Sequence, residues 1–136
     1  MVVGLIPGAG TAERLGPLPF SKELFPVGQT QQLPVCRCLL SNMKASSIRR
    51  AFFVLRQGKW DIPANLGSGQ SLGLSLAYLV IERSPGVPYT LDAAYPHLRD
   101  ATVALGFPDI LFHGPDAYKR CLGRMESSGA DVVLVH

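Results

Sequence analysis

The sequence predicts an α/β fold in which a mostly parallel sheet is covered by helices on both faces. Short apolar runs alternate with segments of helical character, and the first apolar run ends in the glycine-rich turn Pro7-Gly8-Ala9-Gly10. Strands buried on both faces of a parallel sheet are apolar almost throughout, and ligands of such sheets bind beyond the carboxyl ends of the strands. We therefore expect a binding site at the edge of the sheet where this turn lies.

The first half of the chain predicts a strand, a loop, a helix and a second strand. Residues 2–6 form a continuous apolar run that stops at Pro7, which predicts the first strand. Pro34 suits the first turn of a helix that continues to about Lys44. The β-rich run 50–55 predicts the second strand.

The second half continues the alternation of strands and helices. We expect a short helix at 60–66, a third strand at 74–81, a helix at 90–98 and a fourth strand at 101–107. The turn-forming segment Ser84-Pro85-Gly86 separates the third strand from the helix after it.

The last segment predicts one more helix and a fifth strand. Pro115 opens a helix that runs to about Ser127 and stops at Gly129, and residues 131–135 are apolar after Asp131. This run has the composition of an interior strand, and no turn, cap or helix follows it. We therefore expect residues 1–136 to form a single domain that is truncated or is part of a longer one. The alternative is that the last strand simply ends at a sheet edge.

Composition and charge restrict the class of protein. The 136 residues are 47% hydrophobic and 17% charged, as expected for one soluble globular domain. The net charge of +3 is spread along the chain, which does not favour binding to nucleic acid. The run 2–6 has no basic leader, so we expect neither a signal peptide nor a membrane span, and a cytoplasmic location follows.

Cysteines and histidines do not suggest a metal site or a catalytic group. Cys36 and Cys38 are expected in one helix and Cys121 lies far away, so buried reduced thiols are the interpretation we favour. The three histidines have no spacing that suits a metal site or a catalytic triad, and we assign them no role: His97, His113 and His136.

Segment 7–27 carries the main functional signal. It combines the glycines Gly8 and Gly10 with two cations, Arg14 and Lys22. Glycines allow backbone N–H groups to approach phosphate oxygens, an arginine can hold two oxygens, and a lysine supplies a mobile charge. This set suits a triphosphate, and the alternative is a tight turn flanked by solvated charges.

Two other phosphate-binding motifs fit these residues less well. A P-loop needs Gly-Lys followed by Ser or Thr, which the segment does not contain. A dinucleotide fingerprint needs a third glycine where Glu13 stands and an acidic residue after the second strand, where Arg56 stands. A dinucleotide-dependent oxidoreductase therefore stays as a minor alternative.

The pattern Pro-Gly-Ala-Gly-x-x-x-Arg-Leu at 7–15, followed by Ser-Lys-Glu-Leu-Phe-Pro-Val at 21–27, resembles the signature of the sugar-1-phosphate nucleotidylyltransferases. Glucose-1-phosphate thymidylyl- and uridylyltransferases are familiar members. Further matches follow in the family's order and approximate spacing: Leu66-Gly67-Ser68-Gly69, Leu72-Gly73-Leu74, Tyr78, Ser84-Pro85-Gly86 and Gly106-Phe107-Pro108-Asp109. The resemblance is to the N-terminal half of these longer proteins and implies their Rossmann-like, three-layer nucleotide-diphospho-sugar transferase fold.

The resemblance also implies a site and a reaction. Arg14 would hold the outer phosphates, Lys22 would lie near the α-phosphate, and Asp109 would bind Mg²⁺. The nucleotide would contact Pro7, Gly8, Ala9, Gly10, Thr11 and Gly86. The expected reaction transfers a nucleoside monophosphate from a nucleoside triphosphate to a sugar-1-phosphate and releases pyrophosphate. We expect neither nucleic acid nor a membrane as partner, and the chain could form a homo-oligomer.

Three observations bear on these assignments. Asp109 follows an apolar strand, where a carboxylate suits Mg²⁺, although Pro108-Asp109 is also a common turn dipeptide. Glu13 stands where the family has a small hydroxyl residue, and a carboxylate repels a triphosphate. Ile81 or Glu82 stands where relatives often have a base-reading glutamine. A nucleotide-binding or regulatory module without transfer activity is therefore the second reading.

Overall fold

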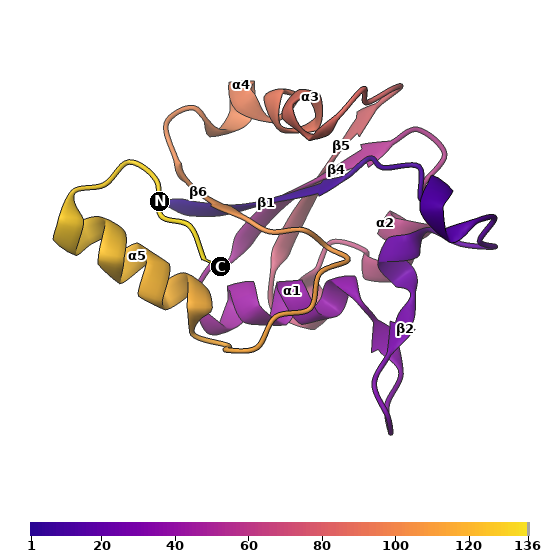
Figure 1. Cartoon of the computed structure of the whole chain (residues 1–136), viewed down its shortest axis with the longest axis horizontal. Helices are drawn as coiled ribbons and strands as arrows, with labels where there is room; N and C mark the ends of the chain where they lie inside the picture. Colours follow the sequence, from indigo (N-terminus) through magenta and orange to yellow (C-terminus); the bar gives the residue numbers. More distant parts are fainter. Residues whose placement is uncertain (136) are drawn as a thin grey trace.

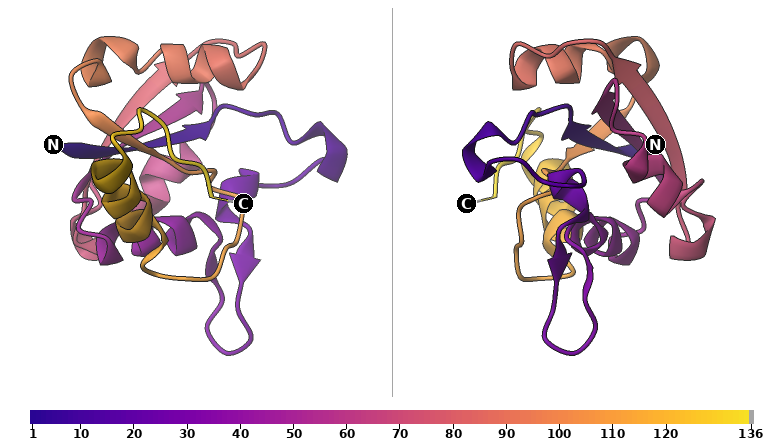
Figure 2. Two further views of the ribbon diagram at one scale, coloured as in Figure 1. Left: turned by 60° about the vertical axis from the view of Figure 1, so that its left-hand side comes forward. Right: turned by 90° about the vertical axis from the view of Figure 1, so that its right-hand side faces the viewer.

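The computed structural model describes residues 1–135, and His136 lies outside the described residues. Within residues 1–135 the main sheet has four parallel strands and lies between two helical layers (Figures 1 and 2). The predicted α/β class with a parallel sheet is confirmed. No helix in this part of the chain is both long and apolar enough to cross a membrane.

The order of the strands across the sheet is β5 (Ser75–Ile81), β4 (Arg50–Arg56), β1 (Val2–Gly8) and β6 (Thr102–Leu105). After β1 the chain builds β4 and β5 on one side, and it then crosses to place β6 on the other side of β1. Such a reversal creates a crevice beyond the carboxyl ends of the two strands that flank it. The ends of β1 and β6 are therefore where this topology favours a ligand.

Strand β1 is longer than predicted because it includes Pro7 and Gly8. The carbonyl of Leu5 accepts a hydrogen bond from Gly106 on the β6 side, and alternate residues of a strand face alternate neighbours. Pro7 therefore faces the β6 side, where β6 pairs only as far as Leu5. The missing N–H of Pro7 costs no hydrogen bond between strands.

One face of the sheet is covered by α1 (Cys36–Ala45), α2 (Asp61–Leu66) and α5 (Ala117–Ser128), and the other by α3 (Val87–Asp92) and α4 (Tyr95–Leu98) (Figure 1). The two helical layers give two apolar cores. The core under α1 and α2 is formed mainly by Ile6, Leu39, Leu40, Met43, Phe53, Leu55 and Ile62. The core under α3 and α4 is smaller and contains Val3, Leu5, Val54, Ala94 and Leu98.

The predicted helix 90–98 is two helices in the structure, α3 and α4, which is a correction. In a continuous helix the N–H of residue 96 would donate to the carbonyl of Asp92. Pro96 has no N–H and its ring would collide with that carbonyl, so the helix breaks there. The other predicted helices and the first four strands agree with the structure to within two residues at each end.

The predicted fifth strand at 131–135 is wrong for the structure, which has no strand there. Val132 and Leu134 are 71% and 84% exposed. A strand exists only by pairing with a neighbour, and this segment pairs with neither edge of the sheet. The apolar composition of residues 131–135 is therefore not sufficient to predict a strand.

A hairpin that the sequence did not predict projects from the body of the molecule (Figure 2). Its strands β2 (Pro26–Val27) and β3 (Leu33–Pro34) are antiparallel, and residues 28–32 form its exposed tip. Gly28 has φ of 116° and a Cβ there would collide with the backbone of Gln31, so the turn requires glycine. The hairpin connects the glycine-rich segment to α1.

Candidate active site

Three of the predicted site residues meet at the carboxyl ends of β1 and β6. The glycine loop follows β1, Asp109 follows β6, and Lys22 lies between them. The Nζ atom of Lys22 is 2.6 Å from Oδ2 of Asp109, although the two residues are 87 positions apart. A Cβ built on Gly10 would lie 3.8 Å from Lys22 Nζ, which places the ammonium against the glycine loop.

The ion pair between Lys22 and Asp109 is accessible to a ligand. The two side chains are 23% and 35% exposed. Both groups therefore keep part of their surface toward solvent while they neutralise each other. A triphosphate or a cation could approach either one from the open side.

Lys22 is held in a short 3₁₀ turn, η2 (Lys22–Leu24), that is anchored on both sides. On one side, the backbone N–H and the hydroxyl of Ser21 each donate to the carboxylate of Asp61 at 2.7 Å. Partial burial acts to raise the pKa of Asp61, but the hydrogen bonds from Ser21 outweigh it and hold that pKa below its ordinary value. Asp61 is the first residue of α2, so this contact joins η2 to the helix.

On the other side, η2 is anchored by a buried ion pair that the sequence analysis missed. Glu23 is fully buried and Lys59 is 6% exposed. Lys59 Nζ donates to Glu23 Oε1 at 2.8 Å and also to the carbonyl of Gly8 at 2.8 Å. The pair thus connects η2, the loop after β4 and the end of β1.

The only hint of this pair in the sequence is that Glu23 is followed by a run of apolar residues, Leu24 to Val27. Charged side chains are mostly exposed, so nothing in the sequence predicts that Glu23 and Lys59 are buried and form an ion pair. Their separation of 36 positions exceeds the range of any helical or turn pattern.

Cys36 lies near this pair, and its thiol is unreactive at neutral pH. Burial raises the pKa of its thiol to about 12, and the negative charge of Glu23 adds to the effect. The thiol is therefore protonated at neutral pH and a poor nucleophile. In the described part of the chain the cysteines are free, with Cys36 buried and the other two, Cys38 and Cys121, only partly buried, which corrects the expectation that all are buried.

The glycine loop is shaped by close packing at its start. A Cβ on Gly8 would lie 2.5 Å from Cε1 of Phe53, so only glycine fits beneath this core side chain. Further along, the hydroxyl of Thr11 donates to the carboxylate of Glu13 at 3.0 Å, and both residues are exposed. The Glu13 carboxylate is thus turned onto the loop itself.

Two predicted site residues, Arg14 and Gly86, make no hydrogen bond or ion pair with Lys22 or Asp109 within residues 1–135. Arg14 lies in the exposed 3₁₀ turn η1 (Glu13–Leu15), and it joins no ion pair within residues 1–135. Gly86 precedes α3 beyond the end of β5, where its carbonyl accepts from the hydroxyl of Ser84. Pro7 lies near the end of β1, and Ala9, which follows the strand, is 3% exposed.

The protein supplies few metal ligands at this centre. Asp109 contributes a carboxylate that contacts Lys22, and no cluster of three or more His, Cys, Asp or Glu residues that could hold a metal occurs among the described residues. Mg²⁺ is commonly held by one or two carboxylates together with substrate phosphates and waters. The donor set therefore fits Mg²⁺ that arrives with a triphosphate, with Asp109 as its ligand.

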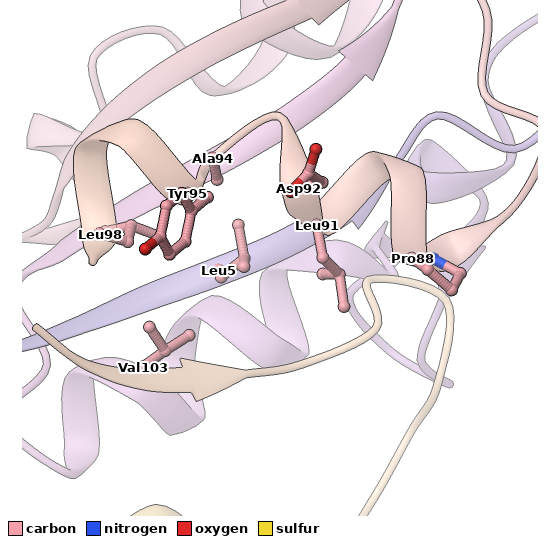
Figure 3. Close-up of a pocket in the computed structure, with 8 residues that line it drawn as sticks. All are labelled: Leu5, Pro88, Leu91, Asp92, Ala94, Tyr95, Leu98 and Val103. Atoms are coloured by element: carbon pink, nitrogen blue, oxygen red, sulfur yellow. The ribbon is translucent and has the colours of Figure 1, made fainter.

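A separate cavity of about 300 Å³ lies between α3, α4 and the strands β1 and β6 (Figure 3). Its lining is mostly apolar, and Asp92 and the hydroxyl of Tyr95 contribute polar groups. The residues that line it are Leu5, Pro88, Leu91, Asp92, Ala94, Tyr95, Leu98 and Val103. No cation lines this cavity, so it does not suit phosphates.

Comparison with known proteins agrees with this geometry. No family model matches the chain. The chain is 31% identical over 117 residues to a glucose-1-phosphate thymidylyltransferase of Mycolicibacterium smegmatis. The match covers 82% of this chain and 39% of that protein. The chain thus spans well under two thirds of the curated relative that it matches.

Two solved structures have the same fold. One is a Bacillus anthracis protein described as a putative glucose-1-phosphate thymidylyltransferase, in complex with sucrose. Its TM-score is 0.82 and its sequence identity 23%, and the match covers 93% of this chain and 52% of that chain. A UDP-glucose pyrophosphorylase complexed with UDP-glucose has a TM-score of 0.76 at 14% identity over 93% and 54%. Over 82% of its length this chain is therefore similar in sequence to a glucose-1-phosphate thymidylyltransferase, and it shares the fold of two solved sugar-1-phosphate nucleotidylyltransferases.

Proposed function

We propose that this chain is the nucleotide-binding part of a nucleotidyltransferase that joins a nucleoside monophosphate to a sugar-1-phosphate. The observation that carries the proposal is the meeting of the glycine loop, Lys22 and Asp109 at the carboxyl ends of β1 and β6. Backbone N–H groups, an ammonium and a carboxylate for a cation are the groups that a Mg²⁺-bound triphosphate requires. The similarity to a glucose-1-phosphate thymidylyltransferase supports the same reaction class.

In the proposed reaction a phosphate oxygen of the sugar-1-phosphate attacks the α-phosphorus of the triphosphate in line. The new P–O bond forms as the bond from the α-phosphorus to the bridging oxygen breaks, and pyrophosphate leaves with the bonding electrons. The protein contributes position and charge: Lys22 would contact the α-phosphate, and loop N–H groups would donate to phosphate oxygens. Mg²⁺ held by Asp109 would neutralise charge on those oxygens.

Binding would exchange the partners of Lys22 and Asp109. In the structure each neutralises the other, and a Mg²⁺-bound triphosphate would offer a phosphate to the lysine and a cation to the aspartate. A partly exposed ion pair contributes at most about 1 kcal/mol, so its exchange costs little.

Calorimetric titration of the chain with dTTP and with UTP, each with and without MgCl₂, tests the binding part of the proposal. A parallel pyrophosphate-release assay with glucose-1-phosphate tests transfer. We expect binding that strengthens with MgCl₂ and that Asp109→Asn makes independent of MgCl₂. The absence of binding to any of several triphosphates by the folded chain would contradict the proposal.

The second candidate is a nucleotide-binding or regulatory module that performs no transfer. It is favoured by Glu13, whose carboxylate accepts a hydrogen bond from Thr11 of the glycine-rich segment and would repel a triphosphate. Triphosphate binding without pyrophosphate release would select this candidate.

A dinucleotide-binding role receives less support from the structure. Dinucleotide sites place the pyrophosphate at the N-terminus of a helix that follows the glycine loop directly. Here the loop leads into two 3₁₀ turns and a hairpin, and α1 begins only at Cys36.

A further inference from the structure

We propose that Lys59, supported by Glu23, is a positioning residue that fixes the Gly8–Ala9 peptide so that the Ala9 N–H faces the triphosphate. The inference rests on the function proposed above, because it assigns the orientation of one phosphate donor in that site. The observations that carry it are the hydrogen bond from Lys59 Nζ to the Gly8 carbonyl and the burial of the Lys59–Glu23 pair.

The direction of the Ala9 N–H follows from the planarity of the peptide bond. In a trans peptide the carbonyl of one residue and the N–H of the next point in opposite directions. No cis peptide bond occurs within residues 1–135. Because the Gly8 carbonyl points to Lys59, the Ala9 N–H points away from Lys59.

The alternation of β1 gives the same direction independently. The Leu5 carbonyl faces β6, since it accepts from Gly106, and alternate residues face opposite neighbours. Gly8 therefore faces β4 and Ala9 faces the β6 side. Strand β6 pairs only as far as Leu5, and Asp109 follows β6, so the Ala9 N–H is directed to the side of the loop where Asp109 lies.

Burial makes the orientation firm. Lys59 has few alternative partners, because its ammonium is enclosed with the Glu23 carboxylate and the Gly8 carbonyl, and a buried charge must keep its hydrogen bonds. Glu23 is also the neighbour of Lys22 in η2. The same pair therefore sets the orientation of a loop donor and the position of the lysine that faces the loop.

The test measures the direction of the Ala9 N–H bond in solution. Residual dipolar couplings of ¹⁵N-labelled full chain are recorded for Ala9 and Gly10, with the amides of β1 and β4 defining the alignment. The variants are Lys59→Met and Lys59→Arg, with Lys44→Met as a matched control, because Lys44 is an exposed lysine on α1. The affinity for dTTP with MgCl₂ is measured on the same samples.

We expect Lys59→Met to move the Ala9 coupling away from its wild-type value while the strand amides still fit one alignment. The affinity for dTTP should fall about tenfold or more. Lys59→Arg should retain both values in large part, and Lys44→Met should retain both fully.

Lys59→Met leaves Glu23 buried without its partner, so a second variant protects the test if the first does not fold. Glu23→Leu with Lys59→Met removes both charges and is expected to fold. An unchanged Ala9 coupling in either folded variant overturns the proposal, and so does a changed coupling with unchanged dTTP affinity. If the wild-type chain binds none of several nucleoside triphosphates, the proposed function fails, and the Ala9 coupling alone still decides whether Lys59 orients the peptide.

Discussion

Lys22 and Lys59 lie on the two sides of the glycine loop and differ in burial and in partner. Lys22 is partly exposed and pairs with Asp109, whereas Lys59 is buried and pairs with Glu23. The exposed lysine can change partners at low cost, and the buried one cannot. This difference suits Lys22 to a ligand and Lys59 to the support of the loop.

Replacing Lys22 should therefore impair function and spare stability. We expect Lys22→Ala to weaken triphosphate binding, and to slow turnover in any active longer form, by about tenfold or more, which is about 1.4 kcal/mol. The free energy of unfolding should change by less than about 1 kcal/mol because the ion pair is partly exposed. Calorimetry and urea unfolding measure the two effects, with Lys44→Ala as the control. Unchanged binding by a folded variant would remove Lys22 from the site.

The buried pair should behave in the opposite way. Glu23→Leu alone or Lys59→Met alone leaves one buried charge without its partner, and we expect each to cost about 3–5 kcal/mol of unfolding free energy. The double replacement leaves no charge behind and should cost less than either single one. Urea unfolding of the three variants gives the coupling energy directly. Additive losses would show that the two side chains do not depend on each other.

Asp61 gives η2 a dependence on pH. Its pKa is below its ordinary value, so its carboxylate stabilises the fold fully above about pH 4 and ceases to do so as the pH falls through the folded pKa. Asp61→Asn should therefore be less stable than the wild type at pH 7, and the difference should shrink below about pH 4. Unfolding curves at several pH values between 3 and 7 measure this. A difference that stays constant over that range would show that the hydrogen bonds from Ser21 to the ionised carboxylate of Asp61 do not stabilise the fold.

Among the elements, β6 and α5 meet at a glycine that has no room for a side chain. A Cβ on Gly106 would overlap the Tyr118 hydroxyl, which donates to the Leu105 carbonyl, and would also overlap Leu39. Burial raises the pKa of Tyr118 to about 12, so its hydroxyl stays a donor at neutral pH. The contact fixes where β6 ends and thus where Asp109 begins its turn.

We expect Gly106→Ala to cost about 1–3 kcal/mol of unfolding free energy by overpacking. Gly123→Ala is the matched control, because a Cβ there meets nothing within 4 Å on α5 and alanine favours a helix. Chemical unfolding of both variants provides the comparison. Equal stabilities would mean that Tyr118 and Leu39 move aside without cost.

The strands and most helices could be predicted because their signals are local. A parallel strand buried on both faces is apolar throughout, as β1 and β4 are, and the helix ends carry proline or glycine. Pro96 is also a local signal, because a proline interrupts a helical pattern, and α3 and α4 are separate helices. The segment 131–135 failed for a different reason, since a strand depends on a neighbour that no local pattern can supply.

In the candidate site, too, the residues with a local sequence signal could be predicted and those without one could not. Gly8, Gly10, Lys22 and Asp109 follow from a recognisable pattern, and the structure places the last three together. The Glu23–Lys59 pair has no local signal because it joins two segments that meet only after folding. Supporting contacts of this kind lie beyond what residue spacing can predict.

At the scale of the whole molecule, the site lies where two halves of the sheet meet, with β4 and β5 on one side and β6 on the other. Strand β1 is shared by both halves, because it pairs with β4 on one side and β6 on the other. A ligand that contacts the loop and Asp109 would therefore link both halves and stabilise the native state as a whole.

A Mg²⁺-bound triphosphate should accordingly raise the melting temperature. At a concentration 100 times its Kd, a ligand that binds only the folded chain adds about 2.7 kcal/mol to the free energy of unfolding. Thermal unfolding with dTTP and MgCl₂ measures this effect, with sodium sulfate at equal ionic strength as the control. An equal rise with sulfate would indicate a general salt effect.

The β2–β3 hairpin has one more consequence. Its tip, residues 28–32, is exposed, while the chain before it is fixed by β1 in the middle of the sheet and the chain after it by α1 in the core. A single backbone cut at the tip would therefore produce two fragments that remain associated through both ladders of β1 and the Lys59–Glu23 pair. The hairpin is thus the position at which this chain could be divided into complementing halves without dismantling its phosphate-binding end.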